Sequence, residues 1–550
     1  MSNIASTTVD GVAGREGASA ASKEHPSSFE PGTFMFLVAL SLFGAIIAIQ
    51  LLTTLGVTPN TSIIGALVAM ILARLPLQFF ARFRSVHVQN LAQSTISAAT
   101  FGAANSLLLP IGIPFLFGRP DLIMPMFIGV SLAMLLDGYL LYRMFGTNVF
   151  PATGTWPPGV AAAEAIKAGD EGGSQAKLLG LGIALGALGS WFKIPMSAFG
   201  TAFIGNIWAL AMFGVGLLLR GYTQPLFGLD ISKLYIPHGV MVGAGLVALF
   251  QVVALIRGKK RVAAETQSTL QANAEKTSQK AIIGSLKLGS LGYIGLALLI
   301  ALGGGLYSDM SPGMLLAFVL YAAFAAFVHE LIVGLAAMHS GWFPAFAVAL
   351  ITLVIGLLIG FPPVALAMLC GFSVATGPAF ADMGYDLKAG YMLRGNGADM
   401  AFEMNGRRQQ LFAALIAFVV AIPVVLLTYN GYFLQGLVPP VAKVYVATIK
   451  AGVSADIAKA LLIWAIPGAL IQLLGGSKRQ LGVLLATGLL IFNAKAGWAV
   501  MVGIALRLLI VRFAGDKARN QMEVFAAGVI AGDALFGFFN SLLATKPAGK

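Results

Sequence analysis

TNVFPATGTWPPGVAAAEAIKAGDEGG, residues 147–173, separates long apolar runs that lie on both sides of it. It places Pro151, Gly154 and the Pro-Pro-Gly run at 157–159 within nine positions. Proline removes a backbone donor and clashes with a helix interior, and glycine opens unusual dihedral angles, so the backbone must break here. Broken segments at membrane depth survive where protein or a cavity surrounds them. We therefore expect residues 147–159 to be non-helical and to line a cavity.

An alanine-rich run follows the break and predicts a helix that begins near Gly159. Glu164 and Lys167 lie three residues apart on one side of this helix. A helix start presents free N–H groups and a partial positive charge, which suits a substrate carboxylate. The alternative is an ordinary surface loop rich in proline and glycine. The candidate substrate-binding residues of this stretch are Gly154, Trp156, Pro158, Gly159 and Glu164.

The composition excludes an ordinary soluble protein. Of 550 residues, 58% are hydrophobic and 10% are charged, whereas soluble domains carry about 25% charged residues. The mean hydropathy is +0.86. The net charge of +13 comes with basic residues clustered in short loops beside apolar runs, which indicates membrane orientation and not nucleic-acid binding. The 66 glycines favour close helix contacts. The single cysteine, Cys370, is expected to pack inside an apolar run.

Apolar runs of membrane-spanning length predict an all-α, polytopic integral membrane protein with about sixteen transmembrane helices. The runs lie at 34–56, 60–80, 92–117, 122–144, 178–195, 197–219, 236–257, 288–306, 312–338, 343–360, 361–380, 410–430, 454–474, 480–495, 497–513 and 521–543. At least one segment is broken or re-entrant, and a polar linker near the middle indicates two related halves. The expected parts are a disordered cytoplasmic tail at 1–32, a first membrane half at 33–256, a basic polar linker at 257–287, and a bundle at 288–545 that holds the rest of the first half and the second half.

Three acids lie inside apolar runs, where charged side chains are costly and usually functional. Asp137, Glu330 and Asp533 are therefore the candidates for proton coupling, with Glu330 ranked first and Asp533 second. Every residue at 315–328 is uncharged, so Glu330 is expected to be desolvated and able to take up and release a proton. The structural alternatives are a pair with Arg143 for Asp137 and a pair with a nearby base for Glu330.

His238 and Asn493 are further candidates for substrate binding. His238 follows a proline at the start of an apolar run, where an interfacial or hydrogen-bonded histidine is the alternative. Asn493 lies two residues from Lys495, whose side chain can extend to the membrane surface. The sequence contains no HExxH, Walker A or GxSxG motif, and its five histidines lack metal-ligand spacing. We therefore expect no enzymatic activity, no cofactor and no metal site.

A second polar stretch, ADMGYDLKAGYML at 381–393, carries three more candidates for substrate binding, Asp382, Asp386 and Lys388. Asp386 and Lys388 are too close in sequence to face each other on a helix. We therefore expect a turn or irregular segment near Gly384, with Lys388 free to bind an acidic group. The alternative is a cytoplasmic loop that obeys the positive-inside rule.

This stretch resembles the D-x-x-x-D-L-K-x-G-Y-x-L signature of the oligopeptide transporter family, which includes the yellow-stripe metal-chelate carriers and many bacterial members. Four other segments are similar to family segments: TWPPGVAAAEAIKAGD at 155–170, IPHGVMVGAG at 236–245, GRRQQLFAALI at 406–416 and AAGVIAGDALFG at 526–537. The matches lie in order over most of the chain. Pro158 replaces the Ser or Thr of the family pattern, and residues 394–405 are longer and more acidic than expected. The resemblance thus indicates a divergent member of bacterial type, related to the yellow-stripe carriers.

The resemblance implies a secondary active transporter that imports short peptides, peptide-like compounds or metal chelates and is coupled to protons. It implies a multi-pass protein of the cell inner membrane, embedded in the lipid bilayer and compatible with a homo-oligomer. Two alternatives stay open. A channel or passive pore predicts a repeated filter or rings of like charge, and a membrane-embedded transferase or hydrolase predicts polar residues clustered at one membrane face. Neither pattern is evident in the sequence.

Overall fold

The computed structural model describes residues 24–55, 65–66, 69–70, 78–171, 173–262, 269–341, 345–452, 455–515 and 518–544. Helices and connecting turns make up these residues, which contain no β-strand, and the isolated β-bridge found among them joins Phe145 to Phe150. The prediction of an all-α polytopic fold is therefore confirmed. The run predicted at 60–80 lies mostly outside the described residues.

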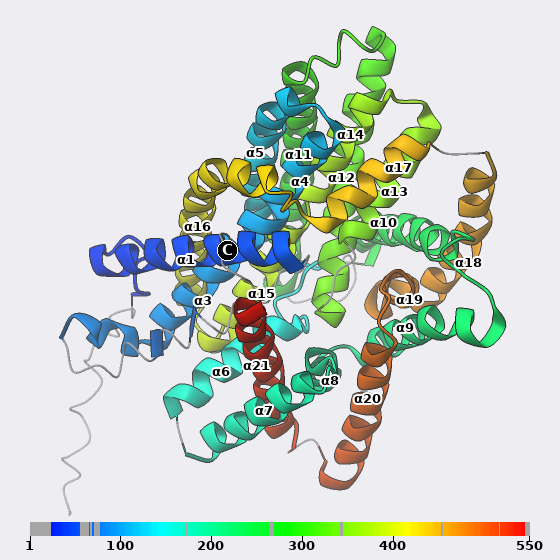
Figure 1. Ribbon diagram of the computed structural model, residues 1–550. Helices are drawn as coiled ribbons and strands as arrows, with labels where there is room; N and C mark the ends of the chain where they lie inside the picture. The colour runs from blue at the N-terminus through cyan, green and yellow to red at the C-terminus, as the bar shows by residue number, and fades with distance from the viewer. Residues whose placement is uncertain are drawn as a thin grey trace, which may run out of the picture.

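The helices form three groups (Figure 1). The central bundle contains α1 (Pro31–Leu55), α3 (Val86–Phe101), α4 (Leu109–Phe117), α5 (Ile123–Met144), α11 (Thr269–Gly303), α12 (Pro312–Ser340), α13 (Ala345–Ile359), α14 (Pro363–Ala375), α15 (Pro378–Leu393), α16 (Met400–Leu434) and α17 (Pro440–Ala451). The α21 group contains α6 (Pro157–Glu171), α7 (Gly173–Trp191), α8 (Met196–Ile204) and α21 (Arg519–Ala544). The α9 group contains α9 (Ile207–Phe227), α10 (Ile236–Val262), α18 (Ala455–Arg479), α19 (Leu481–Leu490) and α20 (Ala494–Ala514). Three short helices, η1 (Gln78–Arg84), η2 (Gly102–Leu108) and η3 (Pro120–Leu122), complete the described secondary structure.

The helix α15 lies at the centre of these contacts. It packs against α3, α5, α12 and α16 of the central bundle and against α6 of the α21 group. Its residues from Pro378 to Gly390 are all buried. This burial explains why the polar side chains of α15 must find partners inside the protein.

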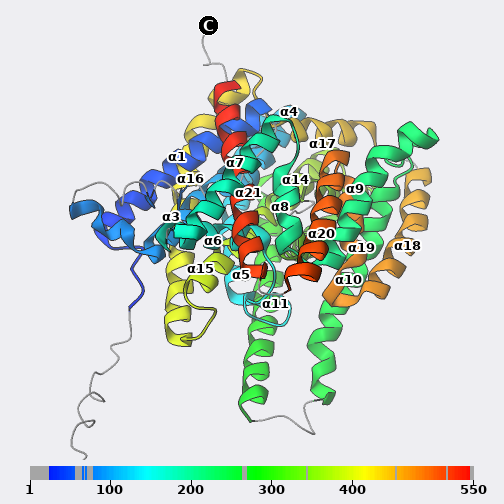
Figure 2. The same ribbon diagram turned by 90° about the horizontal axis from the view of Figure 1, so that it is seen from below.

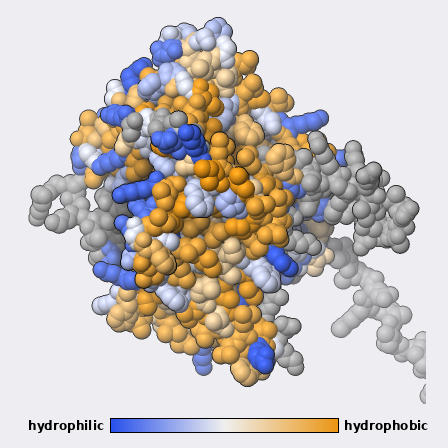
Figure 3. Space-filling view, turned by 90° about the vertical axis from the view of Figure 1, so that its right-hand side faces the viewer, coloured by the Kyte–Doolittle hydropathy of each residue, from blue (hydrophilic) through white to orange (hydrophobic). Residues whose placement is uncertain are grey.

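The surface is that of a protein surrounded by lipid. Among the described residues, nine helical segments are long and apolar enough to cross a membrane, and three shorter apolar helices accompany them. One face is covered largely by hydrophobic side chains (Figure 3). Leu427 and Leu474 are each 82% exposed, and Phe513 is 79% exposed. Exposed apolar area of this kind is unfavourable in water, so an apolar solvent must surround it. The chain is thus an integral, multi-pass membrane protein.

Two predicted spans are broken in the structure. The run at 197–219 divides between α8 and α9 because Asn206 caps the second helix, accepting hydrogen bonds from the amides of Trp208 and Ala209. The run at 361–380 ends α14 at Ala375, and α15 begins after Gly377, whose φ of 101° lies outside the helical region. Glycine tolerates this conformation without the penalty of a Cβ atom.

The polar segment at 1–32 was expected to be disordered, but its described residues, from 24 onward, contact the rest of the protein. Ser28 is fully buried and hydrogen bonds with Gln409 through its amide, at 2.8 Å, and its hydroxyl, at 2.7 Å. The linker is largely helical, because α10 continues to Val262 and α11 begins at Thr269. Figure 2 shows these two helices extending beyond the rest of the molecule. Their Ala, Gln, Lys and Glu content favours helix even without apolar packing.

Candidate functional site

The backbone break predicted at 147–159 is present over residues 147–156, and this segment is partly buried, with Asn148 and Thr153 exposed. After α5 the chain turns back on itself, and the amide of Gly146 donates to the carbonyl of Phe150 at 2.8 Å. The amide of Trp156 then donates to the carbonyl of Met338 at 2.8 Å, which anchors the segment to the end of α12. The helix α6 begins at Pro157, two residues before the predicted position. The prediction of a non-helical segment followed by a helix is confirmed, whereas its lining of a cavity stays a prediction.

The start of α6 does not present the free N–H groups that we expected near Gly159. Pro157 and Pro158 have no amide hydrogen. The next two amides, of Gly159 and Val160, both donate to the carbonyl of Trp156, at 2.9 and 3.1 Å. This helix end is therefore closed to a substrate carboxylate in the described conformation, and that prediction was wrong.

Trp156 is held between the break and α15. Its side chain is fully buried, and its φ of 37° is rare for a residue with a Cβ atom. Its ring lies against Gly384, where an added Cβ would come within 2.2 Å of Cζ3 of the tryptophan. Tyr385 packs edge-on against the same ring at 6.0 Å. Gly384 is thus a site of close contact inside a continuous helix, and the turn predicted there is absent because α15 runs unbroken from Pro378 to Leu393.

Lys388 lies on the same side of α15 as Gly384, since four residues advance a helix by about 40° beyond one turn. Its ammonium group donates to the carbonyl of Ala152 at 3.1 Å and lies 5.6 Å from the ring centre of Tyr391. The prediction that Lys388 is free in a loop is therefore wrong for this conformation. The side chain ties α15 to the broken segment.

The opposite face of α15 carries two acids. Asp382 accepts a hydrogen bond from the hydroxyl of Ser97 at 2.5 Å, and Asp386 accepts one from Nε2 of Gln93 at 2.5 Å. Gln93 in turn accepts from Nδ2 of Asn90 at 2.9 Å. All five side chains are buried. We name this set, Asn90, Gln93, Ser97, Asp382 and Asp386, the α3–α15 acid cluster.

A buried basic cluster continues from it. Glu403 bonds to both Arg394, at 2.8 Å, and Arg407, at 2.6 Å. Gln410 joins the two clusters, because its Oε1 accepts from Arg394 at 2.8 Å and its Nε2 donates to the carbonyl of Asp386 at 2.6 Å. Arg407 and Gln410 belong to the segment GRRQQ, which the family resemblance singled out. Glu403, which pairs with Arg407, lies in the acidic stretch 394–405, which departs from the family pattern.

The acids Asp137 and Glu330, predicted separately, meet in one buried group. Tyr293 donates its hydroxyl hydrogen to Oδ1 of Asp137 at 2.6 Å, and the amide of Gly377 donates to Oδ2 at 3.2 Å. Glu330 interacts electrostatically with both Asp137 and Tyr293, and its Oε1 has no hydrogen-bond partner among the described residues. This α5–α12 acid pair lies at the break between α14 and α15. Asp137 does not need Arg143, because the tyrosine and the helix start supply its donors. The sequence missed Tyr293, which is a single hydroxyl in an apolar run.

The other predicted residues lie apart from these clusters. Asp533 accepts hydrogen bonds from the hydroxyl of Ser190 and from the amide of Ser197 at the start of α8. Glu164 pairs with Lys167 at 2.9 Å. Asn493 caps α20, and His238 at the start of α10 packs at a tilted angle against Tyr235, with ring centres 5.6 Å apart. Gly154 and Pro158 pack against α12 and the residue after it: an added Cβ at Gly154 would lie 2.8 Å from Met338, and one at Gly341 would lie 2.9 Å from Pro158.

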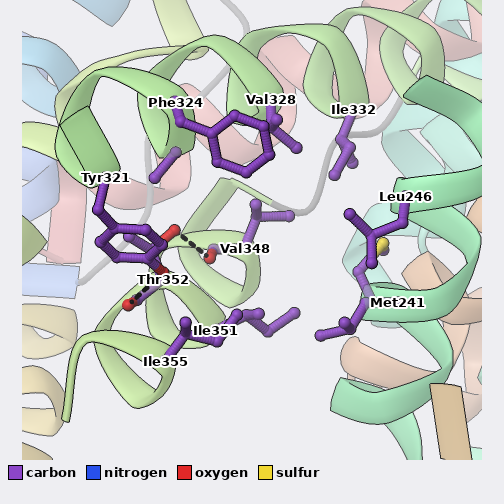
Figure 4. A pocket seen from close by; sticks show the side chains of 13 residues that line it. Met241, Leu246, Tyr321, Phe324, Val328, Ile332, Val348, Ile351, Thr352 and Ile355 are labelled. Atoms are coloured by element: carbon purple, nitrogen blue, oxygen red, sulfur yellow. Dashed lines mark hydrogen bonds between the residues drawn. The ribbon is translucent and has the colours of Figure 1, made fainter. Parts of the chain in front are cut away.

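An apolar cavity of about 80 Å³ lies between α10, α12 and α13 (Figure 4). It lies where the α9 group contacts the central bundle. Two polar residues, Tyr321 and Thr352, line it, and the Tyr321 hydroxyl donates to the backbone carbonyl of Thr352 at 3.0 Å. Within the described residues no group of three or more His, Cys, Asp or Glu side chains could hold a metal ion.

The sequence matches the family model described as OPT oligopeptide transporter protein over residues 33–256 and again over residues 229–544. No curated protein matches the chain. The two family matches together span most of the chain, and they agree with its fold of apolar helices surrounded by lipid. The chain therefore belongs to the OPT oligopeptide transporter family.

Proposed function

We propose that this protein is a proton-coupled secondary transporter of the cell inner membrane, which imports short peptides, peptide-like compounds or metal chelates. The family supports transport of a small molecule. The coupling ion is inferred from one observation, the α5–α12 acid pair. The proposed substrate classes follow from the resemblance of the chain to the bacterial and yellow-stripe members of the family.

The acid pair has the chemistry of a proton carrier. Asp137 and Glu330 are 0% and 1% exposed. An ionised carboxylate only accepts hydrogen bonds, so two carboxyl groups can hydrogen bond to each other only when they hold a proton. Losing that proton leaves two negative charges in a low-dielectric interior, which is costly unless water or a new partner reaches them. Proton release should therefore accompany a rearrangement around the pair.

The position of the pair connects that rearrangement to α15. Asp137 accepts from the amide of Gly377, the residue before α15 begins. Further along α15, Gly384 and Lys388 contact the broken segment. A change in the charge of Asp137 would thus alter the packing of α15, which also contacts Trp156. We propose that substrate contacts Trp156, Pro158, Gly159 and Lys388 when this packing opens.

The test uses purified protein in proteoliposomes. A thermal-shift screen with di- and tripeptides, glutathione-like compounds and iron or nickel chelates first identifies a ligand, since binding stabilises the folded form. With that ligand, an inward proton gradient should drive accumulation above equilibrium, whereas a pore would only equilibrate it.

Glu330→Gln should abolish uphill accumulation and retain exchange of substrate across the membrane, because glutamine keeps the shape but cannot release a proton. Asp137→Asn should act in the same way. Asp533→Asn is the matched comparison, because this acid lies outside the pair. Accumulation at the wild-type level in Glu330→Gln would place the proton elsewhere or exclude a proton as the driving ion.

A further inference from the structure

Residues 24–30, which precede α1 and contain no helix, are bonded to α16. The amide of Ser28 donates to Oε1 of Gln409 at 2.8 Å, and the Ser28 hydroxyl donates to the Gln409 carbonyl at 2.7 Å. Glu30 pairs with Arg82 of η1 at 2.8 Å. Since η1 is followed directly by α3, this N-terminal segment connects α16 with the start of α3.

His25 extends these contacts to the ends of three helices. It is 4% exposed, and its ring lies 5.0 Å from that of His87 at the start of α3 and 5.5 Å from that of Phe402 at the start of α16. An added Cβ at Gly406 would lie 2.8 Å from Cδ2 of His25 and 2.3 Å from Cδ of Arg394, so the two side chains are neighbours. Arg394 is the residue that follows the last turn of α15. The N-terminal segment therefore lies where α3, α15 and α16 begin or end.

The N-terminal segment covers buried charge and is itself held by modest contacts. Beside His25, Glu403 pairs with both Arg394 and Arg407, and the side chains of Glu403 and Arg394 are 0% exposed. Burial of paired charges carries a desolvation cost, which water would relieve if the segment moved away. The ion pair of Glu30 with Arg82 is partly exposed, and such pairs contribute little to stability. Detachment of the segment therefore costs less than its burial alone would indicate.

We infer that the N-terminal segment is a latch, which holds α16 against η1 and α3 and releases during each transport cycle. The same junction includes α15, because Nε2 of Gln410 donates to the hydroxyl of Ser94 on α3 at 3.1 Å and to the carbonyl of Asp386 at 2.6 Å. Helix groups of transporters move against one another during alternating access. A movement that separates α3 from α16 must break the bonds of this segment. The inference rests on membership of a transporter family and does not need proton coupling.

The first experiment fixes the latch in the full chain. Ser28→Cys and Gln409→Cys are introduced with Cys370→Ala, which removes the single native thiol, and are joined by a short bis-methanethiosulfonate reagent. Uptake down a gradient is measured with radiolabelled trialanine or a radiolabelled iron chelate, whichever stabilises the protein in the thermal-shift screen. Uptake should be lost on cross-linking and should return when dithiothreitol removes the reagent. Phe29→Cys with Phe34→Cys is the matched control, because these rings stack at 6.1 Å and their cross-link does not include α16.

Ser28→Cys with Cys370→Ala provides the second measurement, because Ser28 is fully buried. Its thiol should react slowly with a polar maleimide at rest and faster while uptake proceeds. Adding Gln409→Ala, which removes the acceptor of the Ser28 amide, should speed the reaction at rest by about fivefold. Phe29→Cys is the control, since Phe29 is 56% exposed and should react quickly in both conditions.

Three results would overturn the inference. The first is wild-type uptake by the protein cross-linked between positions 28 and 409. The second is an equal loss of uptake in the control cross-link between positions 29 and 34, which would assign the loss to the reagent. The third is a labelling rate at position 28 that is the same at rest and during uptake, which would show that the segment is a permanent structural contact.

Discussion

Trp156 shows how one residue joins the broken segment to the central helix. Its positive φ is costly for a side chain with a Cβ atom, and such strain persists only where surrounding contacts enforce it. Those contacts are the hydrogen bond from its amide to Met338 and the packing of its ring on Gly384 and Tyr385. Gly384 on α15 therefore leaves the space that the ring of Trp156 occupies.

Gly384→Ala should destabilise the protein, because the new methyl group would overlap the indole ring of Trp156. Overpacking of this kind costs about 1–3 kcal/mol. The measurement is thermal unfolding in detergent, together with transport in proteoliposomes. Trp156→Phe in the Gly384→Ala background should recover part of the loss, since the smaller ring leaves room. If Gly384→Ala lowers stability equally in the wild type and in the Trp156→Phe background, the contact with the indole ring is not the cause.

At the scale of elements, glycines let α7 and α21 approach closely. An added Cβ at Gly186 would come within 2.2 Å of the carbonyl oxygen of Val529, and one at Gly532 within 2.1 Å of the carbonyl oxygen of Ile183. Contacts of backbone with backbone are the usual result of small residues at membrane helix interfaces. This close approach also brings Asp533 to the start of α8.

Gly186→Ala should therefore lower stability, because neither backbone can move aside without separating the helices. Gly180→Ala is the matched control on the same helix, since nothing lies within 4 Å of its added Cβ. That control should be neutral or should stabilise by up to about 1 kcal/mol, the helix-propensity difference between the two residues. The midpoint of thermal unfolding measures both. Equal effects of the two substitutions would contradict the packing argument.

Residues 24–30, which precede α1 and pack against α16, contain a buried histidine, His25, whose protonation makes this contact depend on pH. The pKa of His25 is lowered from 6.5 to about 3, mainly by burial and in part by the positive charges of Arg394 and His87. The hydrogen bond to the carbonyl of Pro26 and the charge of Glu403 oppose this shift. The folded state thus binds this proton more weakly than the unfolded state. The contribution of neutral His25 is complete above about pH 6.5 and declines as the pH falls toward about 3.

We expect residues 24–30 to detach more readily from α16 as the pH falls from about 7.5 to about 5. A spin label at position 29, introduced as Phe29→Cys with Cys370→Ala, would report this as increased mobility, because Phe29 is 56% exposed and Cys370 is buried. His25→Phe keeps an aromatic ring and should remove most of the pH response. The same response in His25→Phe would assign it to another group.

At the scale of the whole molecule, the α9 group meets the central bundle around an apolar cavity (Figure 4). Alternating access in transporters usually moves one group of helices against another. A cavity between two groups provides space for such a movement at little cost in lost contacts. The α9 group is therefore the part of the molecule that we expect to shift during transport.

Ala325→Leu places a larger side chain in this cavity. At about 24 cal/mol for each Å³ filled, the folded state should gain about 1–2 kcal/mol. Transport should slow, because the filled interface resists rearrangement. Leu316→Phe is the control on the same helix, since Leu316 is 60% exposed. Unfolding and initial uptake rates test both effects, and an Ala325→Leu protein with higher stability and wild-type uptake would show that the cavity does not take part in the movement.

The sequence by itself determined the fold class and the backbone break before α6. Apolar runs, with a low share of charge, require helices in lipid because the backbone must satisfy its own hydrogen bonds there. The prolines at 157–158 determine the start of α6, because proline is tolerated in the first helical turn and not further inside a helix. The position of Asp137 and Glu330 inside apolar runs was enough to predict them as functional acids. The count of about sixteen spans and the two related halves stay predictions.

Only the tertiary structure decided which of these residues meet. Asp137 and Glu330 share Tyr293, and Asp386 faces Gln93, because helices far apart in sequence pack side by side. The contact between Gly384 of α15 and the ring of Trp156 joins residues far apart in sequence, so no local pattern contains it. Local propensity and periodicity describe one helix at a time, whereas the partners of a buried polar group are set by the packing of the whole bundle.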